Sequence, residues 1–176
     1  MIRRRHGGGV AKEARIEIRQ AVDGDAAGLA RLFGQLGNPA ETGVMGERLG
    51  LVAARADHWC GVAMSEDGSL IGCLHVFLAP ILEAGMVAHV GGLIVETDWR
   101  RRGVGCRLMA AGEAWARDAG AGAMYVRTRV TRPDAHAFYE SIGYVRAKTQ
   151  FAYRKRLDAC APPEAGRSHL PEDPAR

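Results

Sequence analysis

The sequence has few cysteines, and none of them lie close together. The chain of 176 residues has no Cys-x-x-Cys pair and no histidine at zinc-finger spacing from its four cysteines, which are Cys60, Cys73, Cys106 and Cys160. A disulfide framework and a structural zinc site are therefore excluded as the basis of the fold. We expect reduced thiols in a cytoplasmic protein and no bound metal.

The sequence also lacks a long hydrophobic run. No stretch reaches the roughly 18 uncharged apolar residues of a membrane-spanning helix. The basic residues within 1–9 are not followed by the apolar segment of a secretory signal. Hydrophobic residues make up 47% of the chain and charged residues 25%, which is ordinary for a soluble globular protein. We therefore expect no membrane partner.

Positive charge is in excess only at the amino terminus. Residues 1–15 hold five basic residues and one acidic residue, which accounts for the whole net charge of +4. A nucleic-acid-binding domain is expected to concentrate basic residues on its folded body, so nucleic acid is not an expected partner. We expect a flexible basic arm over 1–13, one domain over 14–157, and a flexible tail over 158–176, where four of the seven prolines stand.

The pattern of apolar and turn residues predicts a mixed α/β fold. Alternating or continuous apolar runs predict strands over 15–19, 59–64, 70–78, 86–95, 123–129 and 144–157. Apolar residues at helical spacing predict one helix capped by Asp23, a second capped by Thr42, and further helices over 103–119 and 133–141. In chain order, one strand and two helices precede three strands, after which helices alternate with the remaining strands.

The segment after the run at 86–95 combines arginine and glycine at a helix start. The strand ends in Leu93-Ile94-Val95, and the sequence Arg100-Arg101-Arg102-Gly103-Val104-Gly105 leads into the helix. A helix N-terminus presents free backbone N–H groups and a partial positive charge, which together suit a phosphate group. The glycines lack the Cβ atoms that would obstruct a phosphate oxygen. The segment has neither the Lys-Ser/Thr ending of a Walker loop nor the third glycine of a dinucleotide-binding fingerprint.

A second motif lies on the helix expected over 133–141. The pattern Ala135-x-x-Phe138-Tyr139-Glu140-x-x-Gly143-Tyr144 follows the pattern Arg100-x-x-Gly103-x-Gly105 along the chain. In this order, the two motifs resemble those of the GNAT superfamily of N-acetyltransferases. The resemblance covers about residues 15–157. It implies the α/β acyl-CoA N-acyltransferase fold, in which helices flank a mixed, mostly antiparallel sheet with a splayed parallel strand pair.

The resemblance implies acetyl-CoA as a cosubstrate, without a metal. The pyrophosphate would rest on the turn of Arg100, Arg101, Arg102, Gly103, Val104 and Gly105, with Cys106 on the following helical turn. The pantetheine arm would pair with the backbone of Leu93, Ile94 and Val95, where an N–H group would polarise the thioester carbonyl. Many relatives have an asparagine that touches the cofactor where this chain has Arg132, which binds a cofactor phosphate or faces solvent.

The resemblance also implies a catalytic tyrosine. Tyr139 matches the family tyrosine that faces the cofactor sulfur and gives a proton or hydrogen bond to the departing thiolate. Many relatives carry a glutamate base where this chain has Gly91 and Gly92, so the usual base is missing. The alternatives are His89 on the same strand, His75 on the preceding strand, or a chain of water molecules. The two glycines leave room for a bulky acceptor or form a bulge.

The resulting expectation is an N-acetyltransferase. It would move the acetyl group of acetyl-CoA to a primary amine by direct attack in a ternary complex. The acceptor would be a small-molecule or peptide amine. The alternative is a non-catalytic acyl-CoA-binding sensor on the same fold, which the missing glutamate favours. Because dimers formed through the final strands are common in this family, a homodimer is a further expectation.

Overall fold

The structure, a computed structural model, describes residues 15–157 with the exception of 36 and 38. The arm expected over 1–13 and the tail expected over 158–176 lie outside the described residues. Within the described part, no helix has both the length and the apolar character needed to cross a membrane.

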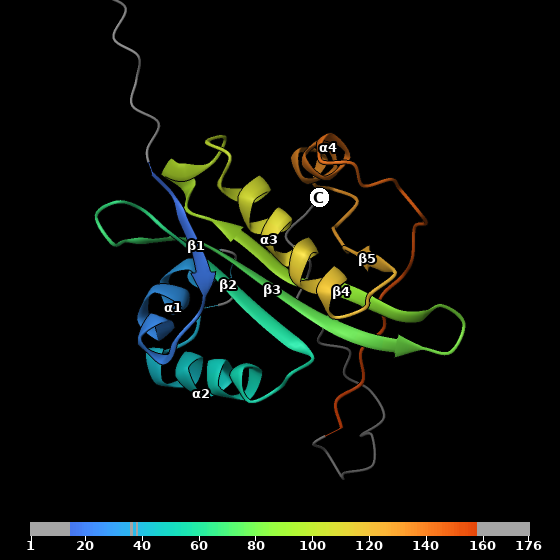
Figure 1. The fold of residues 1–176 in the computed structure, drawn as a ribbon, viewed down its shortest axis with the longest axis horizontal. Helices are drawn as coiled ribbons and strands as arrows, with labels where there is room; N and C mark the ends of the chain where they lie inside the picture. Colours follow the sequence, from blue (N-terminus) through green and yellow to red (C-terminus); the bar gives the residue numbers. More distant parts are fainter. Residues whose placement is uncertain (1–14, 36, 38, 158–176) are drawn as a thin grey trace, which may run out of the picture.

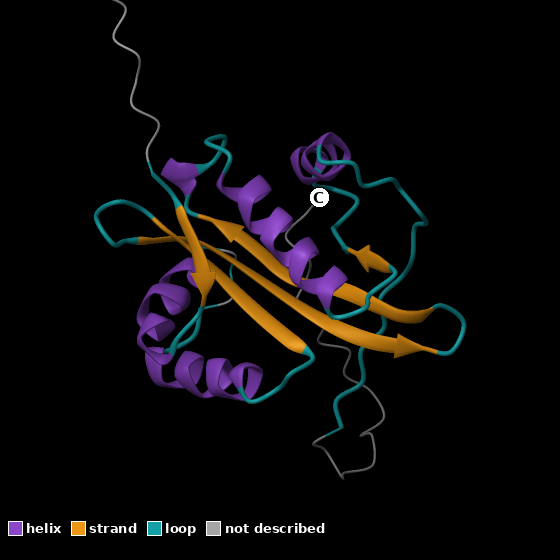
Figure 2. Ribbon diagram, viewed as in Figure 1, coloured by secondary structure: helices purple, strands orange, loops and turns teal. Residues whose placement is uncertain are grey.

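One five-stranded sheet runs through the molecule (Figure 2). Its strands lie side by side in chain order, β1 (Glu17–Gln20), β2 (His58–Met64), β3 (Leu70–Ile81), β4 (Gly85–Val95) and β5 (Ala123–Tyr125). Neighbouring strands from β1 to β4 are antiparallel, whereas β4 and β5 are parallel. The mixed, mostly antiparallel sheet predicted from the sequence is therefore confirmed.

Helices cover both faces of this sheet (Figure 1). One face carries α1 (Ala26–Gly34) and α2 (Thr42–Ala53), and the other carries α3 (Val104–Asp118), with α4 (Pro133–Ser141) beyond it near β5. The core is accordingly divided in two. Leu32 and Leu49 pack with Cys73 on the first face, and Leu74 packs with Leu108 on the second. This arrangement places the start of α3 beside the end of β4.

The carboxyl-terminal strands expected over 144–157 are absent. The described residues from 144 onward form no strand, and the strand expected over 123–129 shortens to Ala123–Tyr125. Apolar residues that alternate at the end of the chain predict a strand, but Val145, Phe151 and Tyr153 are 87%, 89% and 93% exposed. A strand also needs a partner for its backbone N–H and C=O groups, and no strand lies beside this segment in the described structure.

Strand β3 continues to Ile81, three residues past the end at residue 78 that the sequence predicted. The partner strand β2 begins at His58, opposite Phe77, so the last residues of β3 pair only with β4. Proline lacks the N–H group of a sheet hydrogen bond and is tolerated where one side of a strand is unpaired. Pro80 lies at such a position, opposite Met86.

The turn before α1 depends on Asp25 instead of the expected cap Asp23. Asp25 is the residue preceding α1, and its Oδ2 accepts a hydrogen bond from the backbone N–H of Val22 at 2.8 Å. The guanidinium of Arg19 on β1 also donates to both carboxylate oxygens, at 2.7 and 2.8 Å. The side chain of Asp25 is 8% exposed. One buried carboxylate thus connects β1 to the helical face of the sheet.

Replacement of Asp25 by alanine should therefore destabilise the fold in a pH-dependent manner. We expect a loss of about 1–3 kcal/mol at pH 7, the usual cost of leaving part-buried hydrogen-bond donors unsatisfied, because Arg19 and the Val22 N–H lose their acceptor. The hydrogen bonds from Arg19 lower the pKa of Asp25 against the opposing effect of burial. A lowered folded-state pKa gives stability that is present above the unfolded value of about 4 and is lost as the pH falls through the folded value. Urea unfolding of the wild type and of Asp25→Ala at pH 7 and pH 3 measures the difference in their free energies of unfolding. An equal difference at both pH values would show that the Asp25 carboxylate is not the source of the stability.

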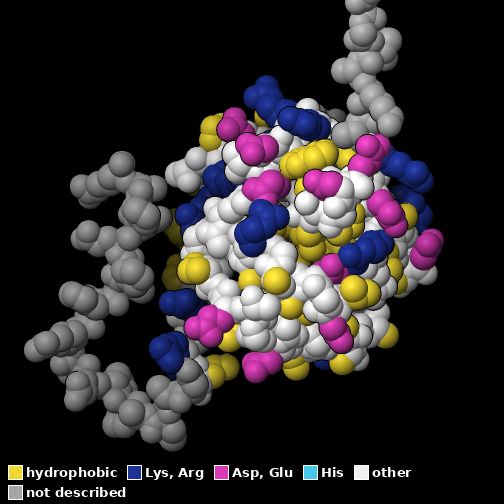
Figure 3. Space-filling view, turned by 90° about the vertical axis from the view of Figure 1, so that its left-hand side faces the viewer, with side chains coloured by type: hydrophobic (Ala, Val, Ile, Leu, Met, Phe, Trp, Pro, Cys, Tyr) yellow, Lys and Arg dark blue, Asp and Glu magenta, His cyan; other side chains and the backbone are white. Residues whose placement is uncertain are grey.

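Acidic and basic side chains alternate over the side of the molecule that carries α1 and the β2–β3 turn. Figure 3 shows Lys and Arg interspersed with Asp and Glu on this face. In the described structure, ion pairs join Arg55 to Asp57 and Arg31 to Glu96. This side of the described molecule therefore carries no broad field of one sign.

Candidate active site

The turn between β4 and α3 is shaped by residues in the left-handed region. After Val95 the chain forms a short 3-10 helix over Thr97–Trp99, and α3 begins at Val104. Arg101 has a φ of 61° and Gly103 a φ of 78°. Glycine adopts this region without the cost that a Cβ atom imposes. The backbone is thus bent sharply just before the first turn of α3.

The bend leaves a row of backbone N–H groups without acceptors. The N–H of Arg107 donates to the carbonyl oxygen of Gly103 at 3.0 Å, which is the first helical hydrogen bond. For residues 101–106, no hydrogen bond from a backbone N–H exists within the described structure, and no side chain caps the helix. Because helix N-termini also carry a partial positive charge, this row is fitted to bind an anion.

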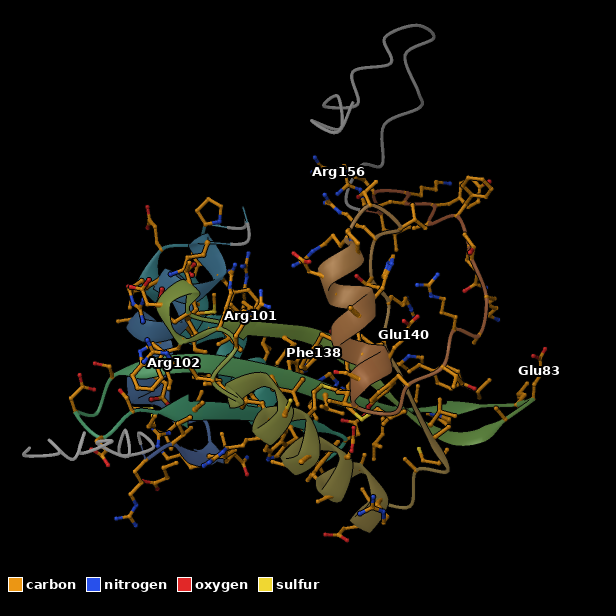
Figure 4. All side chains as sticks on the ribbon, turned by 90° about the horizontal axis from the view of Figure 1, so that it is seen from above. Glu83, Arg101, Arg102, Phe138, Glu140 and Arg156 are labelled. Atoms are coloured by element: carbon orange, nitrogen blue, oxygen red, sulfur yellow. The ribbon has the colours of Figure 1, made fainter. Side chains whose placement is uncertain are left out.

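The arginines of the turn differ in their surroundings. Nε of Arg100 donates to the carbonyl oxygen of Val95 at 3.2 Å, and the guanidinium of Arg102 lies 5.3 Å from the ring centre of Trp99. Arg101 is exposed and has no ion pair within the described residues. In Figure 4, Arg101 lies on the side of the turn nearer α4 and Arg102 lies farther from it. Arg101 is therefore the turn arginine available to a ligand without first giving up a contact.

Strands β4 and β5 separate close to this turn. Their parallel pairing covers only Val87 to His89 on β4, opposite Ala123 to Tyr125. Beyond His89, β4 continues to Val95, and among the described residues β3 is its one strand neighbour there. In an antiparallel ladder, alternate residues turn their N–H and C=O groups away from the partner strand. The stretch of Leu93, Ile94 and Val95 thus presents an unpaired strand edge, and the splayed parallel pair predicted from the sequence is confirmed.

A close contact holds α4 against the first turn of α3. A Cβ atom built on Gly105 would lie 3.2 Å from Cζ of Phe138, so the phenylalanine ring rests directly over the glycine. Figure 4 shows Phe138 between α4 and α3, whereas Glu140 projects from the other side of α4. The ring of Phe138 meets that of Tyr139 edge to face, with 5.2 Å between centroids. The second glycine of the turn therefore sets the position of the tyrosine.

The two tyrosines of the second motif have different hydroxyl environments. The hydroxyl of Tyr144 donates to Oε1 of Glu113 on α3 at 2.9 Å. The hydroxyl of Tyr139 has no hydrogen-bond partner in the described structure. Since every polar side-chain atom there that lacks a partner keeps some contact with solvent, this hydroxyl is not sealed from solvent. Burial raises the pKa of Tyr139, against an opposing effect of Arg132. Tyr139 is thus a protonated, accessible phenol, which fits a proton donor.

Both candidate histidines lie on the sheet face that α1 and α2 partly cover. The His89 ring stacks between Phe77 and Tyr125, with centroid separations of 5.4 and 5.6 Å. Burial and the charge of Arg127 lower the pKa of His89. His75 instead contacts a histidine that the sequence did not indicate, because its Nε2 lies 3.0 Å from Nδ1 of His58. The structure therefore offers one isolated imidazole and one paired imidazole.

The glycine pair on β4 forms a bulge. Val90 lies opposite Val76 and Gly92 lies opposite His75, so Gly91 is the extra residue in the ladder. A Cβ atom on Gly91 would lie 2.5 Å from Nδ1 of His75. The bulge is thus one of the two roles that the sequence left open for these glycines, and the imidazole of His75 fills the adjacent space.

A family model identifies the chain. The model described as "Acetyltransferase (GNAT) family" matches residues 23–144. The chain belongs to the GNAT family of acetyltransferases. Membership confirms the family, the fold and the enzyme class predicted from the two motifs, that of an acetyl-CoA-dependent N-acetyltransferase.

Curated GNAT relatives act on different small amines according to their names. The chain is 32% identical to an aminoglycoside N(6')-acetyltransferase type 1 of Stenotrophomonas maltophilia over 148 residues, which cover 82% of this chain and 95% of the relative. It is 30% identical to an aminoalkylphosphonate N-acetyltransferase of Salmonella typhimurium over 86 residues, which cover 48% of this chain and 56% of the relative.

Solved GNAT structures share the fold. Aminoglycoside N-acetyltransferase AAC(6')-Iy in complex with CoA superposes with a TM-score of 0.75 at 20% identity, covering 84% of this chain and 99% of that structure. A putative acetyltransferase from Agrobacterium tumefaciens gives a TM-score of 0.71 at 27% identity, covering 79% of this chain and 99% of that structure.

The sequence located the turn of this GNAT enzyme better than its supporting contacts. Residues 100–106 and Tyr139 lie on the elements where the motifs placed them, and Arg132 precedes α4 with an exposed side chain. The sequence analysis missed His58, which contacts His75, and Glu113, which accepts a hydrogen bond from Tyr144. No local pattern marks either residue. Among the described residues, no group of three or more His, Cys, Asp or Glu is arranged to hold a metal ion.

Proposed function

We propose that this enzyme transfers the acetyl group of acetyl-CoA to a primary amine of an aminoglycoside-type amino sugar. The observation that carries the proposal is the row of N–H groups over 101–106 without acceptors, next to the open edge of β4. The acceptor class is supported by the aminoglycoside acetyltransferase of S. maltophilia, which the chain matches over 95% of its length.

The proposed cofactor position follows the unpaired backbone groups. The pyrophosphate would accept hydrogen bonds from the backbone of 101–106, with the charge of Arg101 beside it. Cys106 belongs to this first helical turn and would lie near the phosphates, away from the thioester. The amide groups of the pantetheine arm would pair with the edge formed by Leu93, Ile94 and Val95. Arg132, exposed at the start of α4, would serve a more distant phosphate.

The proposed reaction is direct attack within a ternary complex. The amine nitrogen attacks the thioester carbonyl, a C–N bond forms, and collapse of the tetrahedral intermediate breaks the C–S bond. A backbone N–H of the β4 edge would stabilise the oxyanion. The Tyr139 hydroxyl would supply a proton or hydrogen bond to the departing thiolate, because burial keeps this phenol protonated. The ammonium form of the acceptor must first lose a proton to a base.

The alternative proposal is a non-catalytic acyl-CoA sensor. Gly91 and Gly92 support it, because they leave the usual carboxylate positions of this family without a side chain. A peptide amine is the alternative acceptor. We also place the protein in the cytoplasm, whose reducing conditions keep thiols reduced. This location follows from the four cysteines of the sequence, which show no paired spacing.

Thiol release with a panel of amines tests the proposed function. We expect acetyl-CoA to bind, and CoA to be released in proportion to acetylated product with neamine as acceptor. A 2-aminoalkylphosphonate, glucosamine 6-phosphate and a peptide with a free amino terminus serve as the other acceptors. Acetyl-CoA binding without release for any acceptor would support the sensor. Release with the peptide alone would overturn the amino-sugar assignment.

A further inference from the structure

The strongest feature outside the cofactor region is the contact between His58 and His75. His58 lies on β2 and His75 on β3, and Nδ1 of His58 is 3.0 Å from Nε2 of His75. The two rings stack with 5.2 Å between centroids, and Phe77 stacks on the His58 ring at 5.5 Å. Strand pairing and stacking thus hold the pair in a fixed orientation.

The other nitrogen of His75 faces the bulge of β4. A Cβ atom on Gly91 would come within 2.5 Å of Nδ1, so any other residue at this position would displace the imidazole. The space next to the bulge, which a side chain of β4 would otherwise enter, is therefore occupied by a basic nitrogen from β3.

This nitrogen has no hydrogen-bond partner in the described structure and is not completely sealed from solvent. The structure gives Nδ1 of His75 no hydrogen-bond partner, and within the described residues no partner-less polar side-chain atom is sealed from solvent. Resting on the acetyl transfer proposed above, we propose that His75 is the base that deprotonates the acceptor ammonium group, and that His58 positions it and receives the proton from it.

The hydrogen bond between the histidines determines which nitrogen can act. If Nε2 of His75 carries the proton and donates it to Nδ1 of His58, then Nδ1 of His75 keeps a lone pair directed to the bulge. The ammonium proton passes to Nδ1 of His75, and the Nε2 proton passes to Nδ1 of His58. His58, which lines a shallow pocket with Gln20 and Leu49, then returns a proton to solvent from its Nε2. The overall reaction releases this one proton and leaves each imidazole with its remaining proton on Nδ1. The starting tautomers return when Nδ1 of His75 gives its proton to water, Nδ1 of His58 passes its proton back to Nε2 of His75, and Nε2 of His58 takes a proton from water.

The protonation state of His75 suits this role. Burial, followed by the neighbouring charge of His58, lowers the pKa of His75, so the imidazole is neutral at pH 7 and ready to accept a proton. The titratable groups near the pair are Asp57, next to His58 on the chain, Cys60, opposite His75 in the β2–β3 ladder, and His89 on β4 beyond Phe77. His89 also has a lowered pKa, but within the described structure its ring nitrogens have no hydrogen bond to fix a tautomer or pass on a proton.

The test compares His75→Gln with two variants of the positioning residue. We expect His75→Gln to lower kcat/KM with neamine about tenfold or more at pH 7, at the low end for loss of a general base because water partly replaces it. The loss should shrink as the pH rises and free amine accumulates. Acetyl-CoA affinity, measured by calorimetry, should stay within about twofold. His58→Gln keeps an acceptor for Nε2–H and should retain more activity than His58→Leu.

Controls separate the base from the fold and from the proposed function. His136→Gln alters a histidine that bonds the carbonyl oxygen of Arg129, and it should leave the pH profile unchanged. Nitrogen NMR of the wild-type enzyme should show His75 protonated at Nε2, and this readout does not depend on turnover or on a variant folding. A proton on Nδ1, or a wild-type pH profile in folded His75→Gln, would overturn the proposal. Wild-type enzyme without turnover on any amine would instead refute the proposed function.

Discussion

Replacement of Gly105 by valine is expected to weaken acetyl-CoA binding about hundredfold, a change of roughly 2.7 kcal/mol in binding free energy. The Cβ atom alone would lie 3.2 and 3.3 Å from ring atoms of Phe138, and the valine methyl groups extend farther. The ring must move, because 3.2 Å is closer than ordinary carbon contacts allow. Because the valine methyl groups reach farther than the Cβ atom, we expect the Phe138 ring and α4 to shift away from α3, or the helix start that presents the N–H groups of 101–106 to be distorted.

Calorimetric titration with acetyl-CoA measures this effect, and Gly50→Val is the matched control. A Cβ atom on Gly50 of α2 meets nothing within 4 Å, so the same change of side chain meets no neighbour at the Cβ position there. We expect Gly50→Val to bind acetyl-CoA with an affinity within about twofold of the wild type. The fold should tolerate this change, because valine is a better helix former than glycine. Unchanged affinity in Gly105→Val would remove the start of α3 from the cofactor site.

The sequence predicted the site best where the relevant information is local. The helix expected over 103–119 is observed at Val104–Asp118, and the expected turn of arginines and glycines precedes it, with Gly103 in the left-handed region. Both features depend on neighbouring residues, because apolar spacing defines the helix and backbone freedom defines the turn. The strand expected over 86–95 likewise matches β4, which begins one residue earlier.

Contacts across the sheet could not be predicted in this way. His58 and His75 are 17 positions apart and meet diagonally, because His58 lies opposite Phe77 and Cys60 lies opposite His75. That geometry depends on the register of β2 against β3, and the approach to Gly91 depends further on a one-residue bulge. A shift of register by one residue would turn every side chain to the other face. The strands predicted over 144–157 were wrong for a related reason, because a local pattern does not show whether a strand has a partner to pair with.

Replacement of Tyr139 by phenylalanine is expected to lower kcat about 10²-fold or more, the usual contribution of a positioned general acid. The change removes only the hydroxyl, which has no partner in the described structure, so packing against Phe138 and Tyr144 is retained. Acetyl-CoA affinity should stay within about twofold, because the phenol would act on the thiolate that forms during the reaction. Steady-state thiol release with neamine gives kcat, and calorimetry gives the affinity.

Tyr144→Phe provides the matched comparison because it also removes one tyrosine hydroxyl, from a ring that contacts Tyr139 just beyond the end of α4. Its hydroxyl donates to Glu113, so its removal leaves a half-buried carboxylate without that hydrogen bond and should cost about 1–3 kcal/mol of stability. Turnover of the folded Tyr144→Phe enzyme should remain near that of the wild type. The two variants are thus expected to separate cleanly, one losing turnover and the other losing stability. Equal kcat in Tyr139→Phe and wild-type enzyme would exclude this phenol as the proton donor, and equal loss of kcat in both variants would indicate that the tyrosine pair acts through packing.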